Sequence, residues 1–407
     1  MRHAQTTAGH SDHAPFEVVR GTNQSGMRAH NERLVLTLIR QKGPMAKSEI
    51  ARMSGLSAQT VSVIMRALEA DGLLQKGTPI RGKVGQPSVP MGLAAEGAFF
   101  LGLKVGRRSL DMILTDFLGQ IISRVHLTHR IPTPDSVVRF ANDAIGQLLE
   151  QLSPEHRDRV AGLGIAIPFR LWDWADALGV RSADMADWQD RDIAEDIGDK
   201  WSFPVYLKND ASAACGAELV FGNQDRPPDF LYFFIGFFVG GGLVLDNALY
   251  TGRTGNAGAV GSLPISTTTG DRRQLIDVAS LATLERVLVE AGTAPDTIWE
   301  SSRTWSVPEA HCEKWIAEAA EGLASAITSS ACLIDFECVV IDGWLPPPVR
   351  AELVAQVESC LTRNRVAGID LPEVRGGTIG GEARALGAAS LPLSNRFLVD
   401  RNAFLKE

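Results

Sequence analysis

The stretch "AKSEIARMSGLSAQTVSVIMRALEADGLL", residues 46–74, predicts two helices separated by a tight turn. A short helix over 48–53 ends at Gly55, and Ser57 is a favoured N-cap for the helix that follows. That second helix is amphipathic, and its apolar face is formed by Val61, Ile64, Met65 and Leu68. A helix, a glycine turn and a second helix with a polar start are typical of the helix-turn-helix, whose second helix enters the major groove of DNA.

The flanking sequence completes a small DNA-binding unit. Before it, "NERLVLTLIRQKG" (31–43) predicts an amphipathic helix that ends at its glycine. After it, "LLQKGTPIRGKVGQPSVPMGL" (73–93) predicts two strands around a basic tip at 77–87, which is a β-wing. The predicted DNA contacts are Ser57, Gln59, Thr60, Ser62 and Arg66 on the second helix and Arg81, Lys83 and Gln86 on the wing.

The charge of this unit differs from that of the rest of the chain. Residues 30–90 contain nine Lys or Arg and four Asp or Glu, although the whole chain has a net charge of −8. A basic module on an acidic body is the charge distribution of a nucleic-acid reader attached to another domain. The alternative is a helical bundle with an exposed hairpin that docks a protein. The polar helix face, the wing and the charge together favour a winged helix-turn-helix that binds double-stranded DNA.

Composition limits the remaining possibilities. With 407 residues, 45% of them hydrophobic and 22% charged, the chain has the balance of a globular protein of two or three domains. No apolar run approaches the ~20 residues that span a bilayer, and the polar start has no apolar signal core, so we expect a cytoplasmic protein without a membrane partner. Five scattered cysteines without a C-x-x-C pair predict reduced thiols. We expect no metal and no other cofactor.

We divide the chain into a disordered tail (1–29), the winged helix-turn-helix (30–90), a linker (91–98) and an α/β body (99–400). Strand-rich starts followed by strand–helix units occur twice in the body, which predicts two lobes with a cleft between them. The expected elements are hairpin strands over 98–127, a helix over 130–152, buried strands over 160–168 and 204–210, a helix over 211–222, a strand pair over 230–252, a late strand over 331–346 and a late helix over 350–365.

The strand ends indicate where a ligand binds. Ligands of open α/β sheets bind beyond the carboxyl ends of the strands. The strands over 160–168 and 204–210 therefore place Pro168 to Arg170 and the pair Asn209-Asp210 at the cleft. A carboxylate presented in this way is either a catalytic base or a ligand contact.

Head and body together resemble the ROK family, which contains sugar-responsive repressors and sugar kinases. The matching stretches, in family order, are "GQPSVPMGL", "LTDFLGQII", "GLGIAIP", "KNDASAACGAELVFG", "GFFVGGGLVLDNALYTGRTGNAGAVGSLPI" and "GGTIGGEARALGAA". The resemblance implies that the body has the two-lobed actin/hexokinase-like (ribonuclease H-like) fold of that family. It also implies that a sugar binds in the cleft.

The sequence departs from the family pattern at the positions that kinases need. Lys104 stands where the family's first phosphate loop has an aspartate, and Phe237 and Phe238 enter the second phosphate loop. Ala259 replaces the family's sugar-binding glutamate, Ser262 replaces its histidine, and the cysteine-rich zinc loop is absent. Phosphoryl transfer depends on placing a metal and neutralising phosphate charge. We therefore predict no catalytic residues and no metal site.

Asp210 occupies the family's catalytic-base position, but without those loops it has no hydroxyl to activate, and we predict a ligand contact. The predicted effector-binding residues are Asn209, Asp210, Arg170, Asn256, Gly258 and Ser262. Two alternatives remain open from the residues alone. Asn209-Asp210 is also a favourable N-cap pair that needs no ligand, and "GRTGNAGAVG" (252–261) also suits a surface loop.

These observations predict a DNA-binding transcription regulator, a repressor of genes for sugar uptake or catabolism. A small sugar or sugar derivative in a catalytically inactive cleft would control it. We expect a homodimer or a higher homo-oligomer on a palindromic operator, because one recognition helix reads only a few base pairs. The alternatives are a DNA-tethered sugar kinase and a DNA-binding protein that responds to no ligand.

Overall fold

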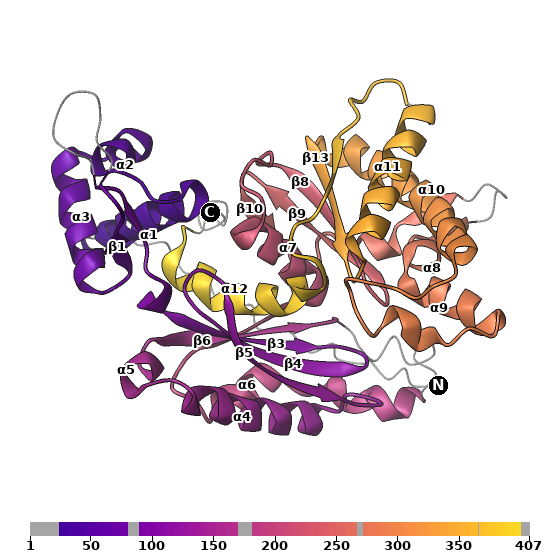
Figure 1. Cartoon of the computed structure of the whole chain (residues 1–407), viewed down its shortest axis with the longest axis horizontal. Helices are drawn as coiled ribbons and strands as arrows, with labels where there is room; N and C mark the ends of the chain where they lie inside the picture. The colour runs from indigo at the N-terminus through magenta and orange to yellow at the C-terminus, as the bar shows by residue number, and fades with distance from the viewer. Residues whose placement is uncertain (1–23, 80–88, 170–180, 267–271, 365, 400–407) are drawn as a thin grey trace, which may run out of the picture.

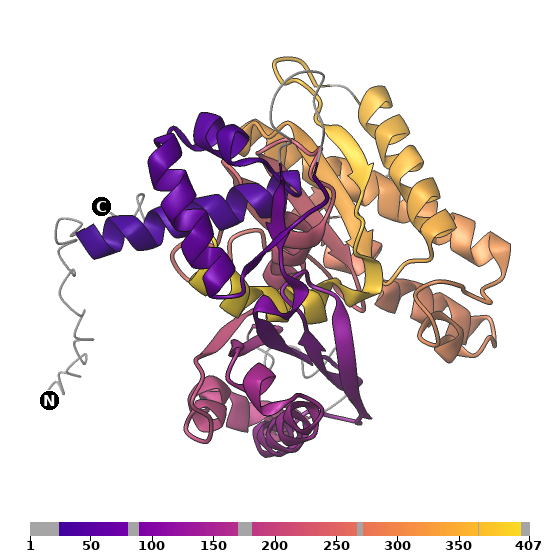
Figure 2. The same ribbon diagram turned by 60° about the vertical axis from the view of Figure 1, so that its left-hand side comes forward.

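The computed structural model describes residues 24–79, 89–169, 181–266, 272–364 and 366–399. Figure 1 shows a small N-terminal head beside a body of two lobes, and Figure 2 shows the same three parts from another side. In the described part of the chain, no helix combines the length and the apolar character needed to cross a bilayer. All five cysteines lie in the described residues, and none forms a disulfide.

The head is a three-helix unit with a two-stranded sheet. Its elements are α1 (Gln24–Lys42), α2 (Lys47–Ser54), α3 (Ala58–Ala70), β1 (Leu74–Lys76) and β2 (Met91–Leu93). β1 and β2 pair antiparallel, as expected for the base of a wing. The predicted apolar face of α3 is buried in the core of the head. The sequence-based helix–turn–helix prediction is confirmed.

Two boundaries differ from the prediction. α1 begins at Gln24 rather than at Asn31, so the last six residues of the predicted tail are helical. The first three residues of the predicted linker form β2 and therefore belong to the head. In both places hydrophobic periodicity marks only the buried part of an element, whereas backbone pairing extends beyond it.

The N-terminal lobe contains a five-stranded sheet of order β5-β4-β3-β6-β7. Its strands are β3 (Phe99–Val105), β4 (Ser109–Thr115), β5 (Ile121–Thr128), β6 (Val160–Ile167) and β7 (Val205–Asn209). β3, β4 and β5 are antiparallel neighbours, and β6 and β7 continue the sheet in parallel. Figure 1 shows α4 (Pro134–Glu150), α5 (Pro154–Arg157) and α6 (Ile193–Gly198) on one side of this sheet.

The C-terminal lobe repeats this plan with the order β10-β9-β8-β13-β14. Its strands are β8 (Phe230–Ile235), β9 (Val239–Leu245), β10 (Ala248–Tyr250), β13 (Cys338–Gly343) and β14 (Glu373–Gly376), and β11 (Pro264–Ser266) and β12 (Arg272–Gln274) form a separate hairpin. Its helices are α8 (Ile276–Ala279), α9 (Leu281–Glu290), α10 (Glu309–Ile334) and α11 (Pro347–Arg363). Residues 331–334 end α10, so the predicted late strand is correct only over its middle part.

Two helices, α7 (Asp210–Phe221) and α12 (Ala383–Phe397), lie between the lobes, as Figure 1 shows. Their backbones approach each other and the sheets closely because glycines occupy the contacts. A Cβ atom added to Gly387 of α12 would lie 1.9 Å from the carbonyl oxygen of Ala213 in α7. A Cβ atom added to Gly164 of β6 would lie 1.9 Å from the carbonyl oxygen of Ala388. Neither position admits a side chain without moving backbone.

Arginines join the head to the body. The Arg40 guanidinium of α1 lies 5.2 Å from the ring centre of Phe117 and 5.7 Å from that of Phe221, the last residue of α7. It also donates a hydrogen bond to the carbonyl oxygen of Phe117. On the other side, Arg159 Nη1 donates to the carbonyl oxygen of Asp71, just after α3, at 3.3 Å. Burial lowers the pKa of Arg40 to about 10.

Two helical glycines should respond oppositely to alanine. Gly387→Ala should lower the free energy of unfolding by about 1–3 kcal/mol, because the methyl group would collide with the backbone of α7. Gly146→Ala in α4 is the matched control, since nothing lies within 4 Å of its Cβ position, and it should stabilise by up to ~1 kcal/mol through helix propensity. Urea denaturation of both variants tests this. A stabilised Gly387→Ala protein would contradict the described helix contact.

Candidate functional site

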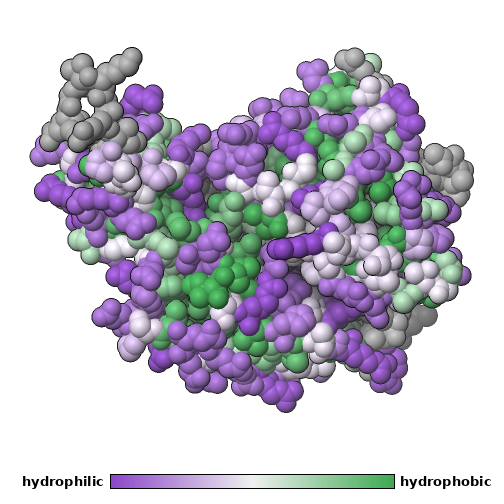
Figure 3. All heavy atoms as spheres, in the orientation of Figure 1, coloured by the Kyte–Doolittle hydropathy of each residue, from purple (hydrophilic) through white to green (hydrophobic). Residues whose placement is uncertain are grey.

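The outer side of the head presents polar groups from α3. Ser57 caps the helix by accepting a hydrogen bond from the Thr60 amide at 3.1 Å, as predicted. Gln59 and Arg66 are exposed, and Arg66 Nε donates to the carbonyl oxygen of Ser62. Figure 3 shows mainly hydrophilic side chains over this part of the molecule. Such a surface suits contact with base edges and phosphates.

The predicted contacts on α3 are not equivalent. The Thr60 hydroxyl lies 2.8 Å from the Ser57 hydroxyl, so both groups take part in capping. The Gln59 side chain is exposed, and its amide group forms no hydrogen bond with the described residues, so it is available to a base edge. Arg81, Lys83 and Gln86, predicted on the wing, lie outside the described residues.

A cavity of about 920 Å³ lies between the lobes. The carboxyl ends of β6 and β7 contribute Pro168, Phe169, Asn209 and Asp210 to its lining, as the strand pattern predicted. The turns after β3 and β8 face it as well, and so does the first turn of α12. Its volume falls in the range of about 300–1,000 Å³ that is usual for small-molecule sites. Arg170 lies outside the described residues.

The side chains of Asn209 and Asp210 form different hydrogen bonds. The Asn209 side-chain oxygen accepts hydrogen bonds from the amides of Ala211 and Ser212 at 3.1 and 3.2 Å, so Asn209 is the N-cap of α7. Its amide NH₂ remains for a ligand. Asn209 therefore caps the helix and also lines the cavity, and its contact with a ligand stays a prediction.

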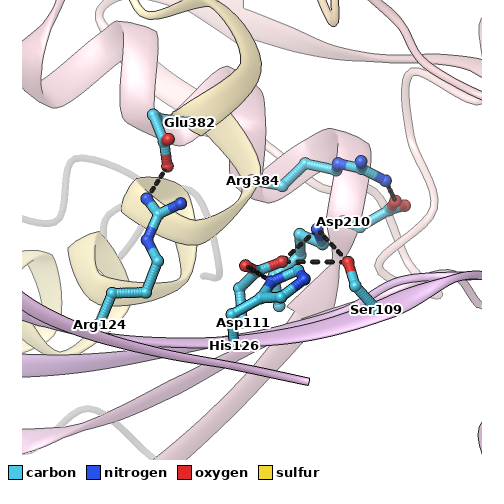
Figure 4. Close-up of polar contacts among 8 residues, drawn as sticks. Ser109, Asp111, Arg124, His126, Asp210, Glu382 and Arg384 are labelled. Atoms are coloured by element: carbon cyan, nitrogen blue, oxygen red, sulfur yellow. Dashed lines mark hydrogen bonds and ion pairs between the residues drawn. The ribbon is translucent and has the colours of Figure 1, made fainter. Parts of the chain in front are cut away.

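Asp210 is held by a partner that the sequence analysis did not predict. Arg384, in the first turn of α12, donates to Asp210 Oδ2 at 3.3 Å. Both side chains are 16% exposed. Figure 4 shows Arg384 reaching over to the Asp210 carboxylate. The Asp210 carboxylate retains further lone pairs that can accept hydrogen bonds from hydroxyl groups of a ligand.

Lys104 forms the centre of a second polar group on the N-terminal sheet. It lies opposite Asp111 in the pairing of β3 with β4 and forms an ion pair with it. Its ammonium also donates to the Ser109 hydroxyl at 3.1 Å. On the neighbouring strand, His126 Nδ1 lies 2.6 Å from Asp111 Oδ1. Figure 4 shows Ser109, Asp111 and His126 gathered on one face of the sheet.

Folding lowers the pKa of both partners of this ion pair, for different reasons. Burial by itself raises the pKa of Asp111, but the charge and the hydrogen bond of Lys104, followed by the hydrogen bond of His126, lower it to about 2. Burial lowers the pKa of Lys104, and the positive charge of Arg384 lowers it further. The site thus stabilises the charged form of Asp111, whereas it destabilises the charged form of Lys104 relative to water.

Two arginines on the turn after β3 bridge the lobes. The Arg107 guanidinium lies 3.7 Å from the ring centre of Phe237, on the turn after β8. Arg108 donates to Glu285 at 2.8 Å and to Asp296 at 3.3 Å, and both acids belong to the C-terminal lobe. These are the turns that the family resemblance assigns to phosphate binding, and here each is occupied by protein groups. Phe237 also packs against Phe238, with ring centres 4.6 Å apart.

The remaining predicted effector residues line the same cavity. Asn256, Gly258 and Ser262 all contribute to it, together with Ala259. Gly258 has a φ of +82°, and a Cβ atom there would lie 2.6 Å from the Cα atom of Gly242. Glycine is therefore required at this position by the approach of the loop to β9. The segment is therefore a loop that also lines the cavity, so its being a loop is compatible with the predicted ligand contact.

Sequence reasoning missed Arg107, Arg108, Asp111 and Arg384. Asp111 could have been found, because strand pairing across the β3–β4 hairpin places it opposite Lys104. Arg384 follows a glycine-rich stretch that was noted only for its resemblance. No local pattern indicates that it meets Asp210, which lies 174 residues earlier. In the described residues, no group of three or more His, Cys, Asp or Glu side chains is arranged to hold a metal ion.

Comparisons with known proteins agree with this geometry. The ROK family model matches residues 100–394, and a winged helix-turn-helix DNA-binding model matches residues 28–75. An uncharacterised protein of Sinorhizobium fredii is 27% identical over 370 residues, which cover 90% of this chain and 91% of that protein. A transcriptional regulator of Mycobacterium bovis is 24% identical over 382 residues, covering 89% and 85%. A xylose repressor of Bacillus subtilis is 24% identical over 250 residues, covering 60% and 62%.

Solved structures share the fold. A ROK family transcriptional regulator, described as a homologue of the E. coli MLC protein, superposes with a TM-score of 0.67 at 20% identity and covers 93% of this chain and 98% of its own. A ROK family glucokinase from Streptomyces griseus, in complex with glucose and AMPPNP, superposes with a TM-score of 0.55 at 20% identity, covering 72% and 99%. The regulator match extends over the head, whereas the kinase match spans about the length of the body.

The ion pair of Lys104 and Asp111 should stabilise the fold at neutral pH. Asp111→Asn should lower the free energy of unfolding at pH 7 by about 3 kcal/mol, because it leaves a buried ammonium without its counterion. Folding depresses the pKa of Asp111, so this stabilisation is complete above about pH 4 and is lost as the pH falls through about 2.

Urea denaturation at pH 7 and pH 3 of the wild type, Asp111→Asn and the double variant Lys104→Met/Asp111→Leu tests the assignment. The double variant should recover most of the lost stability at pH 7, since apolar pairs replace buried ion pairs at little cost. An Asp111→Asn protein as stable as the wild type at pH 7 would show that the pair contributes nothing.

Proposed function

Because the chain belongs to the ROK family and begins with a winged helix-turn-helix DNA-binding module, we propose that it is a sugar-controlled transcription regulator. The head binds an operator, and a small sugar or sugar derivative in the cleft changes the affinity of that binding. The described relatives with an assigned role, a xylose repressor and a transcriptional regulator, support a repressor of sugar-related genes.

One observation carries the proposal: both helices between the lobes run from the cleft to the head. α7 begins at the cleft with Asp210 and ends at Phe221, whose ring packs against Arg40 of α1. α12 begins next to Arg384 and ends at Phe397, which packs against Phe117. Just beyond α12, the Val399 amide donates to the Thr37 hydroxyl of α1 at 3.1 Å. A shift of either helix at the cleft therefore moves a contact of the head.

This connection converts ligand binding into a change in DNA affinity on one condition. The ligand must bind one arrangement of the lobes more tightly than the other, because equal affinity for both shifts nothing. The origin of the lining supports this condition, since its residues come from both lobes and from the first turns of α7 and α12, so a bound ligand contacts parts that move relative to one another. A ligand that contacts Asp210 and the loop at 256–262 together favours the closed arrangement.

The cleft is proposed to bind without catalysis. Phosphoryl transfer needs a metal and phosphate groups placed beside the acceptor hydroxyl. Lys104 and its partner Asp111 lie on the strands that flank the first of the two phosphate turns, and Phe237 of the second turn stacks with Arg107 of the first. Asp210 is bound by Arg384 and serves as a ligand contact. Sugar-dependent release of ADP from ATP by the purified protein would overturn this part of the proposal.

We place the regulator in the cytoplasm as a homodimer or a higher homo-oligomer on a palindromic operator. A single α3 reads only a few base pairs, and twofold pairing doubles the recognised site. Light scattering of the free protein at micromolar concentration tests this. A monomer that binds one operator tightly would contradict it.

DNA binding should depend on the exposed face of α3 and on salt. Gln59→Ala should cost about 1–3 kcal/mol on the preferred operator if Gln59 reaches a base edge, and affinity should fall steeply between about 50 and 200 mM salt. Gln147→Ala, on the outer helix α4, is the matched control and should change nothing. Fluorescence anisotropy with DNA from upstream of its own gene measures both. A Gln59→Ala protein that keeps the wild-type affinity for the preferred operator and the wild-type discrimination against other DNAs would remove Gln59 from base readout.

Asp210 should control the response to the effector and leave DNA binding intact. Asp210→Asn removes a charged acceptor for ligand hydroxyls and the anchor of Arg384, so effector affinity should fall about 10- to 100-fold. Asp143→Asn on the exposed face of α4 is the matched control. A thermal-shift screen of sugars, sugar acids, sugar phosphates and polyols identifies the effector, since a ligand raises stability by mass action.

The variant is then compared with the wild type in the anisotropy assay with and without that effector. Operator affinity without effector should be unchanged, and the effector should no longer alter it at concentrations that saturate the wild type. A normal response of Asp210→Asn would show that Asp210 is only part of the start of α7.

A further inference from the structure

The cleft is basic although the protein is acidic. Among the described residues, its lining contains six Lys or Arg side chains and four Asp or Glu side chains, whereas the chain carries a net charge of −8. The cations are Lys104, Arg107, Arg108, Arg124, Arg130 and Arg384, and the acids are Asp111, Asp210, Asp296 and Glu382. A neutral sugar needs no such excess, because its hydroxyl groups both donate and accept hydrogen bonds and carry no charge for the protein to balance.

Each of the four acids is already paired with a cation. Asp111 binds Lys104, Asp210 binds Arg384, Asp296 binds Arg108, and Glu382 binds Arg124. The negative charge of the described lining is thus neutralised within the protein. Positive charge remains, since no carboxylate of the described residues forms an ion pair with Arg107.

Two buried guanidinium nitrogens of the lining also lack acceptors. Arg107 Nη1 and Arg384 Nε have no hydrogen-bond partner among the described residues. An unmatched buried donor costs about 1–3 kcal/mol, more when it is charged. No oxygen of an acidic or amide side chain in the described residues is left in this state. Both guanidinium groups therefore keep a donor that the described residues leave unmatched.

The geometry brings two of the cations to the same part of the cleft floor. Gly102 of β3 faces the first turn of α12, because its Cβ position lies 2.6 Å from the carbonyl oxygen of Ala385. Side chains two residues apart on a strand point to the same face, so Lys104 also faces this turn. Arg384 belongs to the same turn, and its charge is close enough to lower the pKa of Lys104. Two like charges are therefore held together on the floor.

We propose that the cleft binds an anionic sugar, with the acid group accepting hydrogen bonds from the donors of Lys104 and Arg384 that remain beyond their bonds to Ser109, Asp111 and Asp210. Arg107 supplies positive charge that no carboxylate of the described residues balances. This inference rests on the proposed function and defines the class of its effector. The acid group is a carboxylate, as in an aldonic or uronic acid, or a phosphate ester. Both offer several acceptor oxygens, no obligatory donor and a negative charge, and charge-assisted hydrogen bonds of this kind are about twice as strong as neutral ones. The sugar hydroxyls then meet Asp210, the Asn209 amide and Asn256.

Calorimetry of the full-length protein with matched ligand sets tests the class. Each set contains a neutral monosaccharide, its aldonic and uronic acids and its phosphate ester, for glucose, galactose, xylose and N-acetylglucosamine. In at least one set an anionic member should bind ten times or more tighter than its neutral parent. The carboxylate and phosphate arms distinguish the two sources of negative charge. A neutral parent that binds as tightly as every anionic member, or the failure of all anionic members to bind, overturns the inference.

Variants locate the acid group. Arg384→Gln should abolish the preference for the anionic member, and Arg384→Lys should keep part of it. Arg139→Gln, an exposed arginine on the outer helix α4, is the matched control and should keep the full preference. Arg107→Gln provides a second test, on the turn after β3, and should weaken the preference. Full discrimination in both Arg384→Gln and Arg107→Gln overturns the assignment.

The test of the anionic class and the test of the proposed function can fail independently. A neutral sugar that binds in preference to its acids and releases or tightens DNA leaves the regulator intact and removes the anionic class. An anionic sugar that binds in the cleft, depends on Arg384 and leaves operator affinity unchanged supports the class and rejects the proposed control of DNA binding.

Discussion

The close backbone contact between α7 and α12 is the constraint on which the body depends. Both helices are shared by the two lobes, and they meet where Gly387 has no side chain and the Ala213 carbonyl takes the space. Gly164 on β6 and Gly242 on β9 allow the same approach to the two sheets. With the helices fixed at this distance, the carboxyl ends of the parallel strands face one another across a single cavity. The first turns of both helices then become part of its floor, which is how Asp210 meets Arg384.

The chemistry of that cavity follows from which groups occupy the two turns above it. In a fold that kinases use to place a metal and phosphates, this chain has a buried lysine on one side and a phenylalanine pair on the other. Arg107 and Arg108 connect the turns directly, through the Phe237 ring and through Glu285. Protein groups alone therefore join the two turns, and in the proposed function the binding energy of a ligand selects an arrangement of the lobes.

The head is bound to the body at the far ends of the same two helices. Arg40 of α1 contacts Phe221 of α7 directly and also contacts Phe117, which packs against Phe397 of α12. One buried guanidinium and aromatic packing thus join α1 to both helices. Burial lowers the pKa of Arg40 to about 10, which still leaves it charged at neutral pH. Displacing it would leave a charged group without its aromatic and carbonyl partners, which stabilises the observed position of the head on the body.

By itself the sequence determined what depends on near neighbours along the chain. Glycine turns, helix caps such as Ser57 and Asn209, strand periodicity and the basic charge of the head each act over a few residues, and they predicted the winged helix-turn-helix, the two-lobed body and the strand ends at the cleft. Tertiary structure alone decided which distant groups meet. Asp210 and Arg384 are 174 residues apart, and Arg108 and Glu285 are 177 apart. Such pairs depend on the path of the whole chain around α7 and α12, and no pattern within one segment specifies that path.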